Sequence, residues 1–452
     1  MRIRMITLEK VNKMKQRIKT FFYKYRYAVL SSLLFWGIEL QMQILTGDET
    51  YYRNILNENS LIDNILYYYH YWSNRLLVDT VAMFILHMPM FVFKCINAFI
   101  LFIGQIAIYK LSILINKDSC SMEIISLFTY LIPFSSFMDA GFSVTSIYYL
   151  WTLVAGLWAI YFAVSERKYG YYYILGPVCT VFSCNMEQIS ILIVTVLVTY
   201  CITCIVKRKR NLLCQIEGIL SICMFGYMLL GPGAKYRSNV EAGKCFPEFG
   251  MLSITQKLDM GFSTTMYHFL FEGDIIWLVL TALIMLLLYK KTNDSFYRLL
   301  GCLPFGLSVG LLLMQDMGKM IPGIDTLRNG VEEYGTIYLA NFDMRCKWIL
   351  LILFSLIVLV ILIDFYLLFS FKPMFGICNV LFLVGFASRV VMGFSPTIYE
   401  SGMRTYFLLW MCCIFISILF IQTLGEQFKS RIVRIIFIFV IIQNCSFIYA
   451  LS

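Results

Sequence analysis

The stretch WILLILFSLIVLVILIDFYLLFSF, residues 348–371, decides the class of fold. It has one charged residue, Asp364, in 24 positions, and no glycine or proline interrupts it. A helix needs about 20 apolar residues to cross the hydrocarbon core of a bilayer. A strand of an outer-membrane barrel would instead alternate apolar and polar residues. The stretch therefore predicts a membrane-spanning helix.

The rest of the chain has the same character. Of its 452 residues 60% are apolar and 14% are charged, whereas soluble domains have about 45–50% and about 25%. A soluble globular protein is excluded, and 17% aromatic residues exclude a disordered chain. We predict an all-α, polytopic bundle of about 13 transmembrane helices. They are expected at 27–46, 90–115, 122–138, 147–164, 171–184, 189–206, 216–231, 275–289, 299–315, 348–371, 375–393, 406–423 and 433–450.

The charges predict the orientation. Residues 1–26 hold nine cations and one acid, as expected of a basic cytoplasmic tail before an uncleaved signal anchor. With that end inside, 23 Lys and Arg fall on inner segments and 12 on outer ones. Most of the net charge of +10 thus orients the protein and does not imply nucleic acid. We expect the tail to be followed by one polytopic membrane domain, residues 27–452.

The outer segments are longer and chemically more mixed than the inner ones, and functional residues are concentrated in such loops. The first outer loop, residues 47–89, contains an apolar run at 74–88 that ends before Pro89. This run is too short to cross a bilayer comfortably. It predicts a helix that lies along the membrane interface.

An acid pair opens this loop. Asp48 and Glu49 follow the first expected span, and a carboxylate there could act as a general base. The two acids could also bind a divalent cation such as Mg or Mn. The alternative interpretation is an ordinary acidic helix end in water.

Two further outer positions carry polar clusters. Trp72, Asn74 and Arg75 precede the interfacial helix, where Arg75 would share a face with Asp79. That pair is either a surface ion pair or an arginine held ready for a phosphate or a sugar. Glu187 lies in a polar turn so close to the hydrocarbon that it is a functional candidate by default. A plain turn between spans is the alternative.

Three outer cations oppose the charge bias. Lys235 and Arg237 follow a glycine-rich segment after the seventh expected span, and Arg404 follows the eleventh. Cations at this height favour an anion such as a lipid phosphate. The alternative is contact with lipid head groups in general.

Several chemistries lack their signatures. The chain has three histidines and no zinc-binding pattern. It also has no Walker loop, Rossmann fingerprint or nucleophile elbow. The sequence therefore gives no support for use of a cytosolic nucleotide.

Together these positions resemble the GT-C superfamily of membrane glycosyltransferases, and most of all the bacterial members that glucosylate O-antigen and related surface polysaccharides. The resemblance extends over most of the chain in order and topology. The matching pieces are the acid pair Asp48-Glu49, the element Trp72-Ser73-Asn74-Arg75, the Glu187 turn, the segment Pro232 to Arg237, and Ser395-Pro396 with Arg404.

The resemblance implies a GT-C-like fold and an activity. A sugar would pass from a polyprenyl-phosphate donor to a surface glycan, by inverting displacement, outside the cytoplasmic membrane of a bacterium. The partners would be the donor, the glycan acceptor and the bilayer. A polysaccharide polymerase and a transporter of lipid-linked oligosaccharides remain as alternatives.

The resemblance also implies residue roles. Asp48 becomes the base and Glu49 a second acid or metal ligand, although the family more often has Asp-Asp, which leaves the base between the two. Arg237 and Arg404 become the phosphate clamp. Arg75 and Lys235 are also expected to bind the donor. Trp72, Asn74 and Glu187 are expected to support the site.

Overall fold

The structure is a computed structural model that describes residues 2–42, 47–116, 121–166, 168–314, 322–333, 335–337 and 344–451. These residues form helices joined by turns and no β-strand, so the predicted all-α class is confirmed. Nine helices among them are long and apolar enough to cross a membrane. They are α5 (Met90–Ile115), α7 to α8 (Phe142–Val164), α10 (Glu187–Val206), α11 (Leu212–Leu230), α15 (Ser295–Leu313), α17 (Arg345–Phe369), α18 with η7 (Pro373–Phe394), η8 with α19 (Met403–Gln422) and α20 (Glu426–Leu451).

A tenth candidate is a bent pair. The helix α13 (Ile254–Tyr267) continues as the π-helical turn η4 (His268–Glu272) and meets α14 (Ile275–Lys291) at an angle of 79°. Gly273 lies at the break with φ of +80°, a conformation that favours glycine. The span expected at 275–289 is thus half of a bent element.

The expected count of 13 spans is not confirmed. The helix expected at 122–138 ends as α6 (Met122–Thr129) and is followed by a turn and the 3-10 helix η1 (Phe134–Ala140). The intervening Pro133 cannot donate a helical N–H and disfavours helix just before it. The helix expected at 171–184 is α9 (Tyr172–Ser183), whose 12 residues cover about 18 Å, short of the membrane core.

The first expected span is described in part. The helix α1 (Arg2–Gln41) covers its first residues, and residues 43–46 lie outside the described part of the chain. The run expected to lie along the membrane interface forms the helix α4 (Leu76–His87), which is apolar and shorter than the spans.

The helix α19 forms the centre of the bundle. In its most apolar window 94% of the residues are buried inside the protein, and its contacts with α14 and α18 are extensive. The stretch from α7 to α8 is the next most enclosed, with 72% of that window buried. These helices present the least surface to lipid and fix the positions of the segments at their ends.

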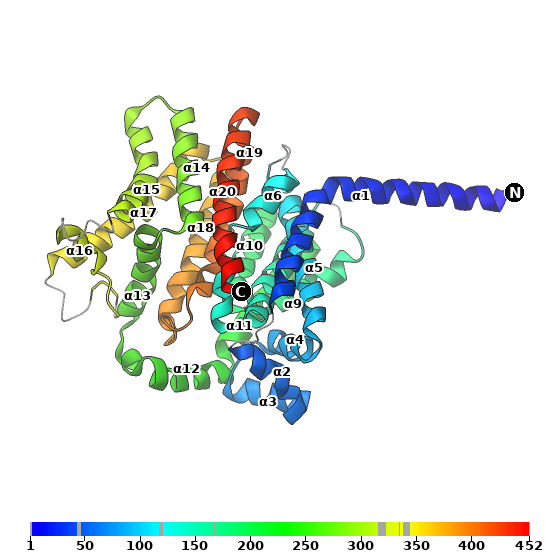
Figure 1. The fold of residues 1–452 in the computed structure, drawn as a ribbon, viewed down its shortest axis with the longest axis horizontal. Coiled ribbons are helices and arrows are strands. Elements are labelled where there is room, and N and C mark those ends of the chain that lie inside the picture. Colours follow the sequence, from blue (N-terminus) through cyan, green and yellow to red (C-terminus); the bar gives the residue numbers. More distant parts are fainter. Residues whose placement is uncertain are drawn as a thin grey trace.

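Four short helices gather at one end of the bundle, the lower end in Figure 1. They are α2 (Asp48–Glu58), α3 (Leu61–Tyr71), α4 and α12 (Pro232–Cys245). The amino-terminal part of α1 extends away from the bundle instead (Figure 1). The first outer loop, residues 47–89, and the segment that follows the seventh expected span thus both contribute helices to this end (Figure 1).

Candidate functional site

A cavity of about 870 Å³ opens at this end of the bundle. Its walls come from α2, the α3–α4 junction, α4, the π-helical turn η2 (Ser146–Trp151), the start of α10, α12, and the α18–α19 connection at 391–405. Of the nine residues selected from the sequence, seven line this cavity. They are Asp48, Trp72, Asn74, Arg75, Glu187, Arg237 and Arg404.

Asp48 is the first residue of α2. Gly47 before it has φ of +54°, and a Cβ there would lie 3.0 Å from the carbonyl of Ala140, so this entry into the helix requires glycine. Loss of water around the carboxylate raises the pKa of Asp48, while Arg404 and Arg237 act to lower it and Glu241 to raise it. Both arginines therefore lie close enough to influence this acid.

Glu49 points elsewhere. The residue is 3% exposed, and its Oε1 accepts a hydrogen bond from the backbone N–H of Ser143 at 2.5 Å. Ser143 is in the first turn of α7, so Glu49 fastens α2 to the start of that span and does not line the cavity. The two acids expected to act together thus face different surroundings, because consecutive helical residues lie about 100° apart.

Arg75 pairs with Glu187 and not with Asp79. The Arg75 Nε lies 2.8 Å from Oε2 and 3.1 Å from Oε1 of Glu187. Arg75 precedes the first turn of α4, and Glu187 begins α10, so the pair joins two polar segments 112 residues apart. The ion pair expected between Arg75 and Asp79 on one helix face does not form.

The Glu187 turn joins several elements. The Oδ1 of Asn185 accepts the N–H of Leu77 at 3.0 Å, and Gln188 donates to the carbonyl of Thr405 at 3.0 Å. The turn therefore holds α4 on one side and the α18–α19 connection on the other. The polar residues of this turn thus hold neighbouring segments in place, and Glu187 and Gln188 also line the cavity.

The helix α12 forms part of the cavity wall and carries Arg237. The Arg237 Nε lies 2.7 Å from Oε1 of Glu241 one turn later, and its guanidinium lies 5.0 Å from the centre of the Trp72 ring. Lys235 on the same helix is exposed and outside the cavity. Arg237 and Trp72 form one part of the wall, and Lys235 is not part of it.

Two glycines allow α12 to approach this closely. A Cβ on Gly231 would lie 2.3 Å from the side chain of Asn74, whose Nδ2 donates to the carbonyl of Met228 at 2.8 Å. A Cβ on Gly233 would lie 2.6 Å from the carbonyl of Tyr68. The φ angles of both glycines are negative, so the small size of these residues, and not an unusual backbone angle, allows the close approach.

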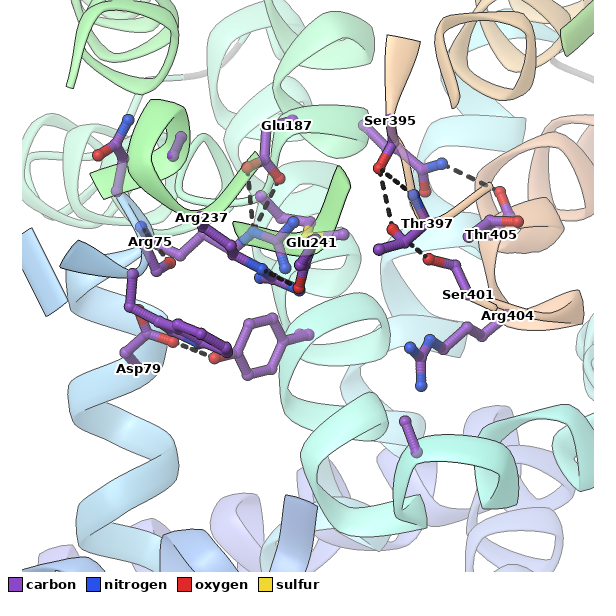
Figure 2. A pocket seen from close by; sticks show the side chains of 18 of the residues that line it. Arg75, Asp79, Glu187, Arg237, Glu241, Ser395, Thr397, Ser401, Arg404 and Thr405 are labelled. Atoms are coloured by element: carbon purple, nitrogen blue, oxygen red, sulfur yellow. Dashed lines mark hydrogen bonds and ion pairs between the residues drawn. The ribbon is translucent and has the colours of Figure 1, made fainter. Parts of the chain in front are cut away.

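The α18–α19 connection forms the opposite wall (Figure 2). Arg404 lines the cavity there, and its guanidinium forms no hydrogen bond or ion pair with another side chain or carbonyl among the described residues. Beside it the hydroxyl of Thr397 lies 2.9 Å from that of Ser395 and 3.0 Å from that of Ser401. This wall thus combines one arginine without a counter-ion and a row of hydroxyls.

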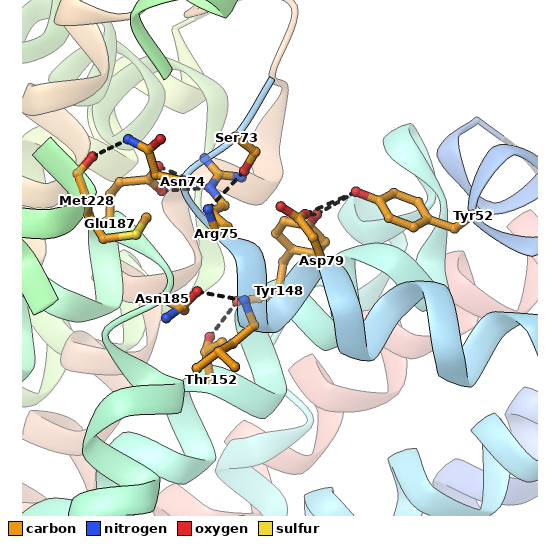
Figure 3. Close-up of polar contacts among 11 residues, drawn as sticks. Tyr52, Ser73, Asn74, Arg75, Asp79, Tyr148, Thr152, Asn185, Glu187 and Met228 are labelled. Atoms are coloured by element: carbon orange, nitrogen blue, oxygen red, sulfur yellow. Dashed lines mark hydrogen bonds and ion pairs between the residues drawn. The ribbon is translucent and has the colours of Figure 1, made fainter. Parts of the chain in front are cut away.

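Asp79 is a cavity residue to which the sequence assigned only the role of a partner to Arg75. Its Oδ1 accepts a hydrogen bond from the hydroxyl of Tyr52 at 3.1 Å and one from Tyr148, and the two hydroxyls lie 2.6 Å apart (Figure 3). Burial raises the pKa of Asp79 to about 6, although the hydrogen bond from Tyr148 and the charge of Arg75 lower it. An acid within an apolar run was the one signal in the sequence that marked Asp79 as a candidate. Its partners Tyr52 and Tyr148 come from other segments, so the sequence did not indicate them.

The charges that line the cavity nearly balance. Three arginines face four acids: Arg75, Arg237 and Arg404 against Asp48, Asp79, Glu187 and Glu241. Two of the arginines have acidic partners. Arg404 is therefore the arginine most available to an anion that enters the cavity.

The described residues give no support for a divalent cation bound by Asp48 and Glu49 together. The resemblance allows Glu49 to be a metal ligand, but the carboxylate of Glu49 accepts a hydrogen bond from the backbone N–H of Ser143. Nor do the described residues contain a group of three or more His, Cys, Asp or Glu side chains arranged to hold a metal ion. We derive no step through a metal.

Comparisons with known protein families, with curated proteins and with solved structures find no match.

Proposed function

We propose that the chain is a membrane glycosyltransferase of GT-C type. It moves a sugar from a polyprenyl-phosphate donor to a surface glycan on the outer side of a bacterial cytoplasmic membrane. The observation that carries the proposal is the cavity itself. Asp48, Arg237 and Arg404 come from three separate segments and meet at the end of a bundle of apolar helices, where a lipid-linked substrate would present its phosphate.

Asp48 is the proposed base, because Glu49 is held by Ser143 and lies outside the cavity. Its carboxylate takes the proton of an acceptor hydroxyl while the hydroxyl oxygen attacks the anomeric carbon of the donor sugar. The bond between that carbon and the phosphate oxygen breaks, and the phosphate keeps the electron pair. One displacement of this kind inverts the anomeric configuration.

Arg404 and Arg237 are proposed to stabilise the leaving phosphate. Arg404 has no counter-ion among the described residues, and Arg237 is held by Glu241 and the Trp72 ring. Hydrogen bonds between charged groups in a site sheltered from water stabilise such developing charge most strongly. Arg75, by contrast, is proposed to position α4 and α10 through Glu187.

The path of α10 supports the proposed orientation. This helix begins at Glu187 in the cavity and runs 20 residues to Val206, where the basic run Lys207 to Arg210 follows. A helix of that length covers about 30 Å, so the run lies near the opposite end of the bundle from the cavity. Because such runs stay in the cytoplasm, we place the cavity outside and the amino end of the chain inside.

Transfer in proteoliposomes tests the proposal. Purified protein is mixed with undecaprenyl phosphate that carries radiolabelled glucose, galactose or mannose, and with extracted surface glycan as acceptor. We expect label in the glycan with the wild type and with the control variant Glu58→Gln, an exposed acid on the same helix as Asp48. Asp48→Asn should retain fold and lose transfer. Full transfer by Asp48→Asn would contradict the assigned base.

A further inference from the structure

Three side chains in the cavity form hydrogen bonds with one another: Asp79 on α4, Tyr52 on α2 and Tyr148 on η2 (Figure 3). All three line the cavity, and all are at most 8% exposed. Tyr52 also has a side-chain hydrogen bond with Tyr68. The guanidinium of Arg75 lies over the Tyr148 ring, 5.5 Å from its centre. The hydroxyl of Tyr148 donates its hydrogen bond to Asp79.

The number of protons in this group decides what it can offer a ligand. Each tyrosine hydroxyl has one proton, and an ionised carboxylate has none. Tyr148 donates to Asp79, and Tyr52 donates to Asp79 or to Tyr148. Both protons are used inside the group whichever bond Tyr52 makes. The phenol oxygens therefore have only lone pairs left for a ligand in the cavity.

We propose that Tyr52, Tyr148 and Asp79 form a sugar-recognition subsite that accepts hydrogen bonds from the hydroxyls of a neutral sugar and disfavours phosphate or carboxylate. A sugar hydroxyl can donate a proton to a phenol oxygen, whereas the phosphate of a phosphodiester and a sugar carboxylate have none to donate. The inference rests on the proposed function, because it takes a lipid-phosphate sugar as the ligand.

The opposite wall has the opposite hydrogen-bonding character. Arg404 is a donor with no acceptor capacity, and it has no counter-ion among the described residues. These two parts of the wall thus differ in what they offer. Arg404 has N–H donors without a counter-ion in the described part of the chain, whereas Tyr52 and Tyr148 offer lone pairs. The neighbouring Arg75 is paired with Glu187. A donor lipid enters with its phosphate toward Arg404 and its sugar toward the tyrosines.

Binding to protein in lipid nanodiscs separates the two ends. The probes are undecaprenol, undecaprenyl phosphate, and undecaprenyl phosphate that carries glucose, galactose or mannose. The sugar preference is the dissociation constant of undecaprenyl phosphate divided by that of the tightest sugar-bearing lipid. We expect it to exceed one in the wild type. Tyr52→Phe, Tyr148→Phe and Asp79→Asn should each lower it about threefold to tenfold, as expected for one lost hydrogen bond.

Two other variants serve as comparisons. Tyr200→Phe removes a hydroxyl that bonds to the carbonyl of Val164 far from the cavity, and it should keep the wild-type preference. Arg404→Ala should weaken the binding of every phosphate lipid and leave the preference unchanged. Each tyrosine variant and Asp79→Asn tests the subsite separately, so one misfolded variant does not prevent the test.

The outcomes separate the subsite from the proposed function. If the wild type binds phosphate lipids more tightly than undecaprenol but the three variants keep its sugar preference, or if the wild type has no such preference, the subsite is wrong and the proposed function stands. If the wild type binds undecaprenol as tightly as every phosphate lipid, the proposed function fails and the subsite with it. A preference lost in the variants of the subsite alone supports both.

Discussion

Gly233→Ala tests the contact that holds α12 over the cavity. The new Cβ would lie 2.6 Å from the carbonyl of Tyr68 and 2.9 Å from the backbone N of Ser73. Both are backbone atoms, so they cannot turn aside as a side chain could. Overpacking of this kind costs about 1–3 kcal/mol. We expect the free energy of unfolding to fall by that amount.

Gly243→Ala is the matched control, because it lies in the same helix and a Cβ there has no atom within 4 Å. Alanine favours helix over glycine by about 1 kcal/mol, so this variant should unfold at or slightly above the wild-type temperature. Thermal unfolding in detergent, followed by tryptophan fluorescence, compares the two. If Gly233→Ala were as stable as Gly243→Ala, the close approach of α12 to α3 would be refuted.

Three further predictions concern the chemistry of the cavity. Asp48→Asn should lower the rate of transfer by about 10²–10⁴-fold, the usual contribution of a general base. Glu49→Gln should retain most transfer, because its amide oxygen can still accept the N–H of Ser143. Equal losses in the two variants would contradict the division of roles. Arg404→Ala should weaken binding of undecaprenyl phosphate about 10-fold to 150-fold, as expected for the loss of a hydrogen bond to a charged group, and the exposed Lys244→Ala on α12 should not. Because Arg404 lowers the pKa of Asp48, Arg404→Ala should also raise that pKa and move the acid limb of the pH–rate profile for transfer to higher pH; an unmoved limb would separate Arg404 from the base.

The class of fold was predictable from the sequence, because apolar runs such as residues 348–371 are long enough for a helix to cross the hydrocarbon core of a bilayer. The described residues confirm nine of the expected spans as long apolar helices. The runs at 122–138 and 171–184 are not confirmed as spans, because apolar composition does not show where a helix ends. Pro133 was the relevant signal in the first of these runs.

The gathering of the site residues was also partly predictable. Polar segments that interrupt apolar runs on one side of a membrane must lie near one surface, and seven of the nine chosen residues do line one cavity. Their partners were not predictable. The Arg75–Glu187 and Asp79–Tyr148 contacts join residues 112 and 69 positions apart, and helical spacing shows only neighbours three or four positions away.

The orientation of individual side chains was beyond the sequence as well. Asp48 and Glu49 look equivalent as neighbours, and only the start of α7 at Ser143 distinguishes them. Lys235 and Arg237 look equally basic, but one is exposed and the other lies between Glu241 and Trp72. In both cases the distinction comes from another segment that packs against one face of a short helix.

The most direct measurement is a cryo-electron microscopy structure of the protein in lipid nanodiscs with bound undecaprenyl phosphate. If the cavity is the donor site, density for the phosphate lies between Arg404 and Arg237, next to Asp48. Phosphate density at the opposite, basic end of the bundle, near Lys207 to Arg210, with the cavity empty, would contradict it.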